Sequence, residues 1–391
     1  MPGSIWNVRP ISEIVPGWRR VAAGLSVAAM AGLALAGATA RAEAPPRVPE
    51  TRNVVFITLD GLRIQELFGG MDPVVSGNPK QSGIYDQKRA RERYWRGTPE
   101  ERRAALMPFF WGTLAPQGIV LGNSAKGSRM TPNNPLLYSE PGYAEILTGQ
   151  YQRGLTSFTG IHSPAETFLE FAQRRLGLGP LEVAVVGSWG ELHNAASRRV
   201  DPFFINAGYE NVPADLATPR MRVLSDAQND IMALWEEGRS DAVTMGIALD
   251  YLTTVRPRLL WIALDESDDW AHARRYDRLL DLLQVYDGYL KRLWEAIDSM
   301  DGYRGRTSIV ITTDHGRGRT ARDWVDHGEK TAGSEEIWCA VIGPDAPRQG
   351  EAMATATVHQ SDVAATILVL LGLDPRDWNP AAGPAIRAAF R

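Results

Sequence analysis

The stretch NVVFITLDG, residues 53–61, joins an apolar run rich in β-branched residues to an aspartate and a glycine. Such short, near-continuous apolarity is typical of a strand that is buried on both faces, as in a parallel sheet. A carboxylate directly after such a strand lies at the carboxyl edge of the sheet, where open α/β sheets bind ligands. The stretch therefore predicts a fold class and also the edge that carries the function.

Further runs of the same character recur along the chain, and helical patterns separate them. They occupy residues 118–123, 181–188, 258–265, 307–314 and 336–343. Residues 274–298 have apolar side chains at a helical period and predict a crossover helix, and residues 361–373 predict a final amphipathic helix. This alternation predicts an α/β three-layer sandwich with a mostly parallel central sheet.

Two stretches fit the alternation poorly, namely residues 73–117, which are rich in charge, and residues 150–256. We expect both to be insertions over the carboxyl edge of the sheet, within a single domain that spans residues 45–391. The sequence contains no internal repeat in this region. Substrate selection is expected to lie in these two insertions.

The N-terminal residues 1–44 have the pattern of an export signal. Arg19 and Arg20 precede the apolar run 21–40, and small residues follow around Ala42. We expect a periplasmic or secreted protein with no stable membrane span after cleavage; an uncleaved anchor is the alternative. The only cysteine, Cys339, cannot form an internal disulfide, and the net charge of -4 argues against nucleic acid as the main partner.

Carboxylates and imidazoles follow three of the predicted strands. The segment DDWAH (268–272) places an aspartate and a histidine four residues apart, on one face of a helical turn. Mixed nitrogen and oxygen ligands in this number suit two divalent ions, with zinc favoured and manganese the substitute. The candidate metal ligands are Asp60, Asp268, His272, Asp314, His315 and His327.

A serine with two possible roles lies in the segment PLLYSEPGYAEILTGQ, residues 135–150. Ser139 precedes Pro141, which is favoured in the first turn of a helix. Serine at a helix start is most often an N-cap. The positive end of a helix also favours phosphate, so Ser139 next to a metal site could instead be a nucleophile.

Together these segments resemble the alkaline phosphatase superfamily. The order VVFITLDG, SEPGYAEILTG, DDWAH, TTDHG and DHGEKTAGSEEIWCAVIGP is that of its nucleotide pyrophosphatase/phosphodiesterase, phosphonoacetate hydrolase and cofactor-independent phosphoglycerate mutase branches. The resemblance covers residues 52–372, apart from the two insertions. It implies that Asp60, Asp314 and His315 hold one metal together with the nucleophile Ser139.

The resemblance further implies that Asp268, His272 and His327 hold the metal that binds the phosphoryl oxygen and later the attacking water. Sulfatases of this superfamily have an arginine where this chain has Tyr143, and the phosphomutases are mostly cytoplasmic. The Thr-Phe-Pro-Asn-His motif of the diesterases is also absent. Arg317 and Arg319 could contact phosphate, and further substrate-binding candidates are Lys126, Arg129, Asn133 and Asn134.

The resulting interpretation is an exported two-metal hydrolase of small phosphate esters that works through a phosphoserine on Ser139. A phosphodiesterase or nucleotide pyrophosphatase is the first alternative, and a sulfatase or a phosphomutase is disfavoured. A catalytically silent metal-binding scaffold is the alternative from another class. The sequence does not predict the oligomeric state.

Overall fold

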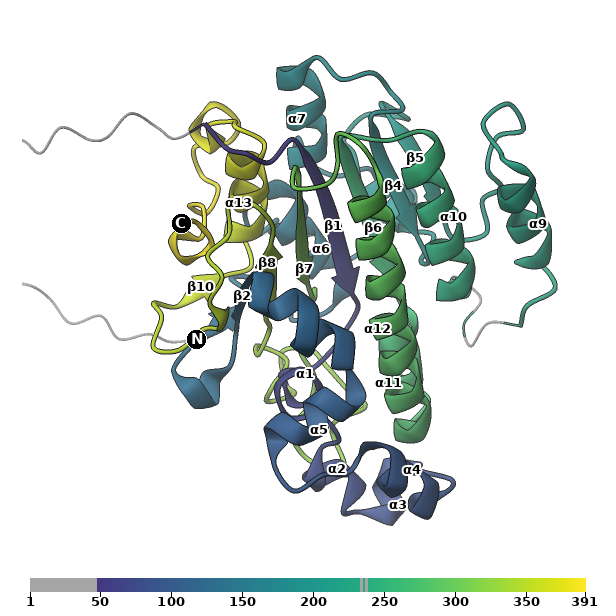
Figure 1. The fold of residues 1–391 in the computed structure, drawn as a ribbon, viewed down its shortest axis with the longest axis vertical. Helices are drawn as coiled ribbons and strands as arrows, with labels where there is room; N and C mark the ends of the chain where they lie inside the picture. The colour runs from purple at the N-terminus through teal and green to yellow at the C-terminus, as the bar shows by residue number, and fades with distance from the viewer. Residues whose placement is uncertain (1–47, 233–234, 236–237) are drawn as a thin grey trace, which may run out of the picture. The chain divides into compact units, whose positions relative to one another are not determined.

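Strand β1 (Asn53–Leu59) lies near the middle of an eight-stranded sheet of order β5-β4-β6-β1-β7-β8-β2-β9 (Figure 1). The structure is a computed structural model and describes residues 48–232, 235 and 238–391, so the predicted export signal lies outside the described residues. The other strands of the sheet are β2 (Gly118–Leu121), β4 (Val183–Gly187), β5 (Phe204–Ala207), β6 (Leu259–Leu264), β7 (Thr307–Thr312), β8 (Cys339–Ile342) and β9 (Gly350–Glu351). Strands β3 (Met130–Thr131) and β10 (Val358–His359) pair separately.

Five neighbouring strands, β5, β4, β6, β1 and β7, run parallel, whereas β8 is antiparallel to both β7 and β2. Thr58 of β1 is in register with Ala263 of β6 and with Thr312 of β7. Because these strands end level, the segments after them meet at one edge of the sheet. The predicted mostly parallel sheet is confirmed, and β8 is an antiparallel exception that the short apolar run did not reveal.

The helices form two layers, one on each face of the sheet. Val55 and Ile57 of β1 face the core shared with α10 and α12, while Val54 and Phe56 face the core shared with α6, α7 and α13. In Figure 1, α12 crosses in front of the sheet. Alternation along β1 thus buries both faces and gives the three-layer architecture predicted from the sequence.

The helices have the following bounds. They are α1 (Ile64–Gly69), α2 (Pro73–Ser76), α3 (Pro79–Ser82), α4 (Gln87–Tyr94), α5 (Pro99–Leu106), α6 (Ser139–Thr148), α7 (Phe168–Leu176), α8 (Leu192–Ala195), α9 (Pro219–Ala227), α10 (Asp241–Thr254), α11 (Glu266–His272), α12 (Tyr276–Ser299) and α13 (Asp362–Leu370). Shorter turns of 3₁₀ or π type occupy Phe110–Leu114, Ala115–Gln117, Ser124–Lys126, Pro375–Asp377 and Arg387–Ala389. In the part of the chain that the structure describes, no helix is both long and apolar enough to span a bilayer.

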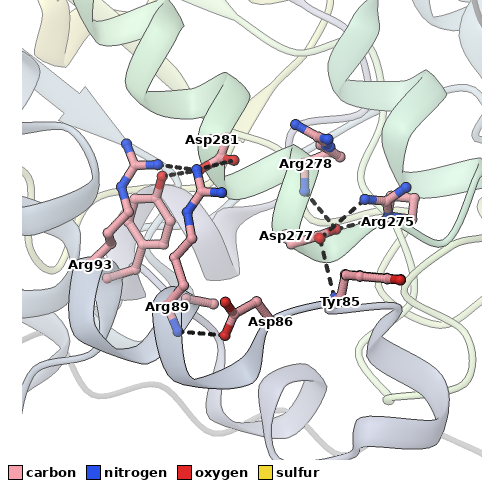
Figure 2. Close-up of a pocket in the computed structure, with 10 residues that line it drawn as sticks. Tyr85, Asp86, Arg89, Arg93, Arg275, Asp277, Arg278 and Asp281 are labelled. Carbon is pink, nitrogen blue, oxygen red and sulfur yellow. Dashed lines mark hydrogen bonds and ion pairs between the residues drawn. The ribbon is translucent and has the colours of Figure 1, made fainter.

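The first predicted insertion is attached to α12 through charged side chains. Figure 2 shows the shallow pocket between α4 and α12, which has a volume of about 110 Å³. Arg93 Nη1 lies 2.8 Å from Asp281 Oδ1, and the backbone N–H of Tyr85 donates to Asp277 Oδ2 at 3.2 Å. No candidate metal ligand lines this pocket. We therefore interpret it as the contact that fixes the insertion to α12, not as a functional site.

The second stretch, residues 150–256, is only partly an insertion. It supplies β4 and β5, which extend the parallel sheet, and it also supplies the packing helices α7 and α10. The expectation that the whole stretch covers the edge was therefore wrong. Two short segments of it do reach the carboxyl edge, because Trp189 forms an isolated bridge with Gly238 just beyond the end of β4.

Gly142 allows α6 to approach the end of β7. A Cβ added at Gly142 would lie 2.5 Å from the carbonyl oxygen of Asp314, whereas one added at Gly288 in α12 would meet nothing within 4 Å. We expect Gly142→Ala to lower the free energy of unfolding by about 1–3 kcal/mol through overpacking. The control Gly288→Ala is expected to raise it by about 0.5–1 kcal/mol through helix propensity. Urea denaturation of both variants tests this, and equal stability of the two would contradict the close packing.

Candidate metal centre

Three ligand-type side chains and the predicted nucleophile converge at the end of β1 and β7. His315 Nε2 lies 3.4 Å from Asp60 Oδ1 and 3.4 Å from Asp314 Oδ2. Both carboxylate oxygens are buried and have no hydrogen-bond donor among the described residues. A buried charged oxygen without a partner is costly, and a cation between the two carboxylates would remove that cost. The residues therefore fit a metal ion.

The remaining carboxylate oxygens of this group are held by the surrounding fold. The hydroxyl of Tyr143 donates to Asp60 Oδ2 at 2.9 Å, and the backbone N–H of Gly61 donates to Asp314 Oδ1 at 3.0 Å. Each aspartate thus has one oxygen held by a hydrogen bond and one oxygen that lies close to His315 Nε2. Such outer contacts orient metal ligands and tune their basicity.

The ring of His315 is oriented in the same way. Its Nδ1 lies 2.9 Å from the carbonyl oxygen of Gly316, and because a carbonyl only accepts, Nδ1 is the protonated nitrogen. Nε2 is then the lone-pair nitrogen, and Ser139 Oγ lies 3.2 Å from it. Ser139 is the first residue of α6, whose N-cap is Tyr138 and has no side-chain cap. Ser139 thus lies beside the candidate metal ligand His315, and its side chain does not cap the helix.

A second group of ligand-type side chains lies directly beside the first. Asp268 and His272, one turn apart on α11, have Oδ2 and Nε2 3.0 Å from each other. His327 comes from the loop before β8, and its Nε2 lies 3.0 Å from that of His272. The rings of His315 and His327 stack with centroids 4.0 Å apart, so the two groups adjoin. This arrangement can hold two neighbouring ions.

Burial and mutual repulsion shift the pKa values of these side chains. Burial, and then the charge of Asp314, raise the pKa of Asp60 well above its ordinary value; burial also raises that of Asp314. Burial, and then His315, lower the pKa of His327 to about 2. His327 is therefore neutral at physiological pH, as a metal-ligating imidazole must be. The carboxylates in turn need a nearby cation to be charged.

Comparisons with known proteins bear on the family and the fold. The family model of the Metalloenzyme superfamily matches residues 216–375, which contain Asp268, His272, Asp314, His315 and His327. A mutant of the alkaline phosphatase PafA has a TM-score of 0.55 at 10% identity, covering 88% of this chain and 99% of its own. The fold is that of the alkaline phosphatase superfamily. The comparison with curated proteins gave no match.

Other solved structures share the alkaline phosphatase fold with this chain. The phosphonate monoester hydrolase SpPMH from Silicibacter pomeroyi has a TM-score of 0.54 at 14% identity, covering 86% of this chain and 76% of its own. The 2-O GAG sulfatase BT1596 has a TM-score of 0.50 at 15% identity, covering 83% and 71%. At such low identity these likenesses show the fold alone. They confirm the predicted resemblance and leave the reaction open.

Arg317 has a role in this site that sequence reasoning missed. Its side chain is 1% exposed, and Nη1 donates to Asp268 Oδ1 at 2.5 Å. A second nitrogen, Nη2, donates to the carbonyl of Val325 at 2.8 Å. Although burial alone would raise the pKa of Asp268, Arg317 lowers it well below its ordinary value. Arg317 thus holds the candidate metal ligand Asp268 in place, and the only sequence signal for this role was its position after Asp314 and His315.

Removing Arg317 is therefore expected to weaken one of the two ion sites. We expect Arg317→Ala to reduce the affinity of the Asp268 group for metal by about 10–100-fold, as is usual for lost outer contacts of ligands. Arg319→Ala is the matched control, because Arg319 pairs with Glu335 and Glu336 on the surface. Competition with a chelator of known affinity measures both variants. Unchanged affinity in Arg317→Ala would refute the positioning role.

None of the four substrate-binding candidates lines the pocket at Ser139, and three of them have side chains that bond to other groups of the fold. Lys126 Nζ pairs with Glu351 at 2.7 Å and with Glu100 at 3.1 Å. Arg129 is exposed, next to the short strand β3.

Asn133 and Asn134 are used by the fold. Their backbone N–H groups donate to the buried carboxylate of Glu145, and the Asn134 side chain donates to it as well, at 3.0 Å. The side-chain oxygen of Asn134 accepts from the N–H of Leu137, and the side chain of Asn133 donates to Ser361. The side-chain amides of both residues thus form hydrogen bonds within the turn that leads into α6 and its surroundings.

A pocket of about 260 Å³ opens at Ser139. Burial, and then Asp268, raise the pKa of Asp269 to about 8, and burial, and then Asp269, raise that of Asp265 well above its ordinary value. Trp189 packs beside the site, with its ring centroid 6.2 Å from that of Tyr143. The full lining is Ser139, Glu140, Trp189, Trp235, Gly238, Asp265, Asp268, Asp269 and His272.

Proposed function

We propose that this protein is a metal-dependent hydrolase of phosphate esters in which Ser139 attacks phosphorus. The observation that carries the proposal is that Ser139 Oγ lies 3.2 Å from His315 Nε2. The same nitrogen lies 3.4 Å from each of the two unpartnered oxygens of Asp60 and Asp314. A hydroxyl placed among metal ligands and open to a pocket is suited to nucleophilic attack. The match to the Metalloenzyme superfamily model supports the same conclusion.

Asp60, Asp314, His315 and Ser139 would hold one divalent ion, and Asp268, His272 and His327 would hold the other. Zinc is proposed on the basis of the mixed histidine and carboxylate ligands, with manganese as the alternative. When bound, such ions lower the pKa of the serine hydroxyl and neutralise the negative charge that develops on the phosphoryl oxygens.

The residues of the chain then supply binding and orientation. Ser139 Oγ loses its proton and forms a bond to phosphorus as the bond to the leaving oxygen breaks, and the leaving oxygen takes up a proton. Water then attacks phosphorus, which frees phosphate and restores the Ser139 hydroxyl. The first intrahelical hydrogen bond of α6 runs from the N–H of Gly142 to the carbonyl of Tyr138, so the N–H groups before Gly142 have no partner within the helix. The positive end of the helix dipole at this turn favours the anionic phosphoryl group.

A phosphodiesterase is the second candidate, and the pocket lining favours it on one point. No lysine or arginine lines the pocket at Ser139 within the described ranges. A dianionic monoester leaves more charge to be neutralised than a monoanionic diester does. Sulfatase activity is disfavoured, because Tyr143, which stands where sulfatases have arginine, is 1% exposed and bonded to Asp60.

An activity screen tests the proposal directly. The metal-loaded protein is incubated with an aryl phosphate monoester, an aryl phosphodiester and an aryl sulfate. We expect release of the aryl alcohol from one or both phosphate esters and a far lower rate with the sulfate. A protein that hydrolyses the sulfate best, or that hydrolyses none of the three, would refute the assignment. Export to the periplasm, proposed from residues 1–44, is tested separately by cell fractionation.

A further inference from the structure

The pocket beside Ser139 has acidic and aromatic walls, which is unusual for a site that receives a phosphate ester. Trp189 and Trp235 line it, and Trp235 is 49% exposed. The other lining side chains include Glu140, Asp265 and Asp269. A negatively charged leaving group would be repelled here, and a neutral one would gain nothing from the carboxylates.

Asp269 is the most buried of the acidic residues that line the pocket. It is 8% exposed, yet its carboxylate makes no hydrogen bond or ion pair with the residues that the structure describes. The carboxylate of Asp265, one turn earlier, likewise has no such partner. Asp269 is buried and Asp265 is half-buried, and two acidic side chains without a partner among the described residues, beside an open pocket, leave room for a cation that the ligand supplies. Neither belongs to the metal-ligand groups described above.

The tryptophans distinguish between two kinds of cation. A metal ion takes oxygen or nitrogen ligands and gains nothing from indole rings. A substituted ammonium group is attracted both by carboxylates and by aromatic faces. The combination of Asp265, Asp269, Trp189 and Trp235 therefore favours an organic cation.

We infer that the preferred substrate is a phosphate ester of an amino alcohol, whose ammonium group lies between Trp189 and Trp235 and faces Asp265 and Asp269. The inference rests on the proposed function, because it assigns the leaving group of the same reaction. The phosphoryl group lies at Ser139 and the cation at the far side of the same pocket. The alcohol released is then a positively charged amino alcohol.

Two substrates of equal shape test the inference. Choline phosphate and 3,3-dimethylbutyl phosphate differ only in the charged nitrogen, which is carbon in the second. We expect kcat/KM of the metal-loaded protein to be about tenfold or more higher for choline phosphate, as cation–π and charge contacts would provide. Equal values of kcat/KM for the two esters would overturn the inference.

Variants of the pocket then show which groups recognise the cation. We expect Asp269→Asn and Trp235→Ala to reduce the ratio of the two kcat/KM values several-fold. The ratio is the readout because a general loss of activity cancels in it. Asp301→Asn, an exposed aspartate beyond α12, is the control and should leave the ratio unchanged. An unchanged ratio in both pocket variants would overturn the assignment of these residues.

A binding measurement separates this inference from the proposed function. Choline is titrated into the metal-loaded protein, with tryptophan fluorescence and calorimetry as readouts. If neither these two esters nor the aryl phosphate esters of the screen are hydrolysed, the proposed function fails, whereas choline binding that Asp269→Asn weakens still supports a cation pocket. If choline does not bind and Asp269→Asn instead loses one metal ion per chain, the pocket holds a metal and the inference is wrong.

Discussion

Replacing Ser139 with alanine is expected to reduce turnover of a phosphate ester by about 10³-fold or more, with the fold and the metals retained. The hydroxyl of Ser139 has one hydrogen-bond contact among the described residues, with His315 Nε2 at 3.2 Å. It does not cap α6, whose N-cap is Tyr138. Its loss should therefore cost little stability but remove the atom that attacks phosphorus. Steady-state rates and thermal midpoints measure the two effects separately.

Thr98→Ala is the matched control for this experiment. Thr98 forms a capping box with Glu101 at the start of α5 and is not part of the pocket lining. We expect its loss to cost about 1 kcal/mol of stability and to leave the rate unchanged. A Ser139→Ala protein that behaves like Thr98→Ala would mean that Ser139 is only structural. A Ser139→Thr protein should keep part of the activity if the extra methyl group fits in the pocket.

The convergence of the metal ligands could be anticipated because of a general property of parallel sheets. Asp60, Asp268 and Asp314 lie near the ends of β1, β6 and β7, and the structure shows that these strands are neighbours in register. The sequence did not contain the order of the strands. It did contain three apolar runs that each end in an acidic group, and the carboxyl ends of parallel strands share one edge. The helical spacing of Asp268 and His272 was likewise local information.

Other features depend on contacts between distant parts of the chain. Lys126 pairs with Glu351, which is 225 residues away, so no local pattern could show that its charge is already used. Arg317 reaches Asp268 across 49 residues for the same reason. Strand β5 has only four residues, too few for a periodic signal. The pocket beside Ser139 likewise depends on Trp189, whose position follows from the place of β4 in the sheet.

Chelation is expected to abolish activity and also to destabilise the protein. Asp60 Oδ1 and Asp314 Oδ2 are buried without a donor, and each lies 3.4 Å from His315 Nε2. Without a cation these carboxylates repel each other in a medium that solvates them poorly, so the folded state loses stability. When the free ion concentration is about 1,000 times the Kd, binding stabilises the folded protein by about 4 kcal/mol. Full chelation removes that contribution. We therefore expect a drop of the thermal midpoint by several degrees that added zinc reverses.

Elemental analysis of protein that has never met a chelator should find about two ions per chain, in keeping with two adjoining groups of ligands. His272→Ala should leave the ion held by Asp60, Asp314 and His315, because His272 contacts only the second group, through Asp268 and His327. His193→Ala is the control and should keep both ions, since His193 pairs with Asp201 and Glu210 outside the pocket. Protein that carries no stoichiometric metal, or whose thermal midpoint is indifferent to chelation, would leave the unpartnered aspartates without an explanation and remove the basis for activating Ser139.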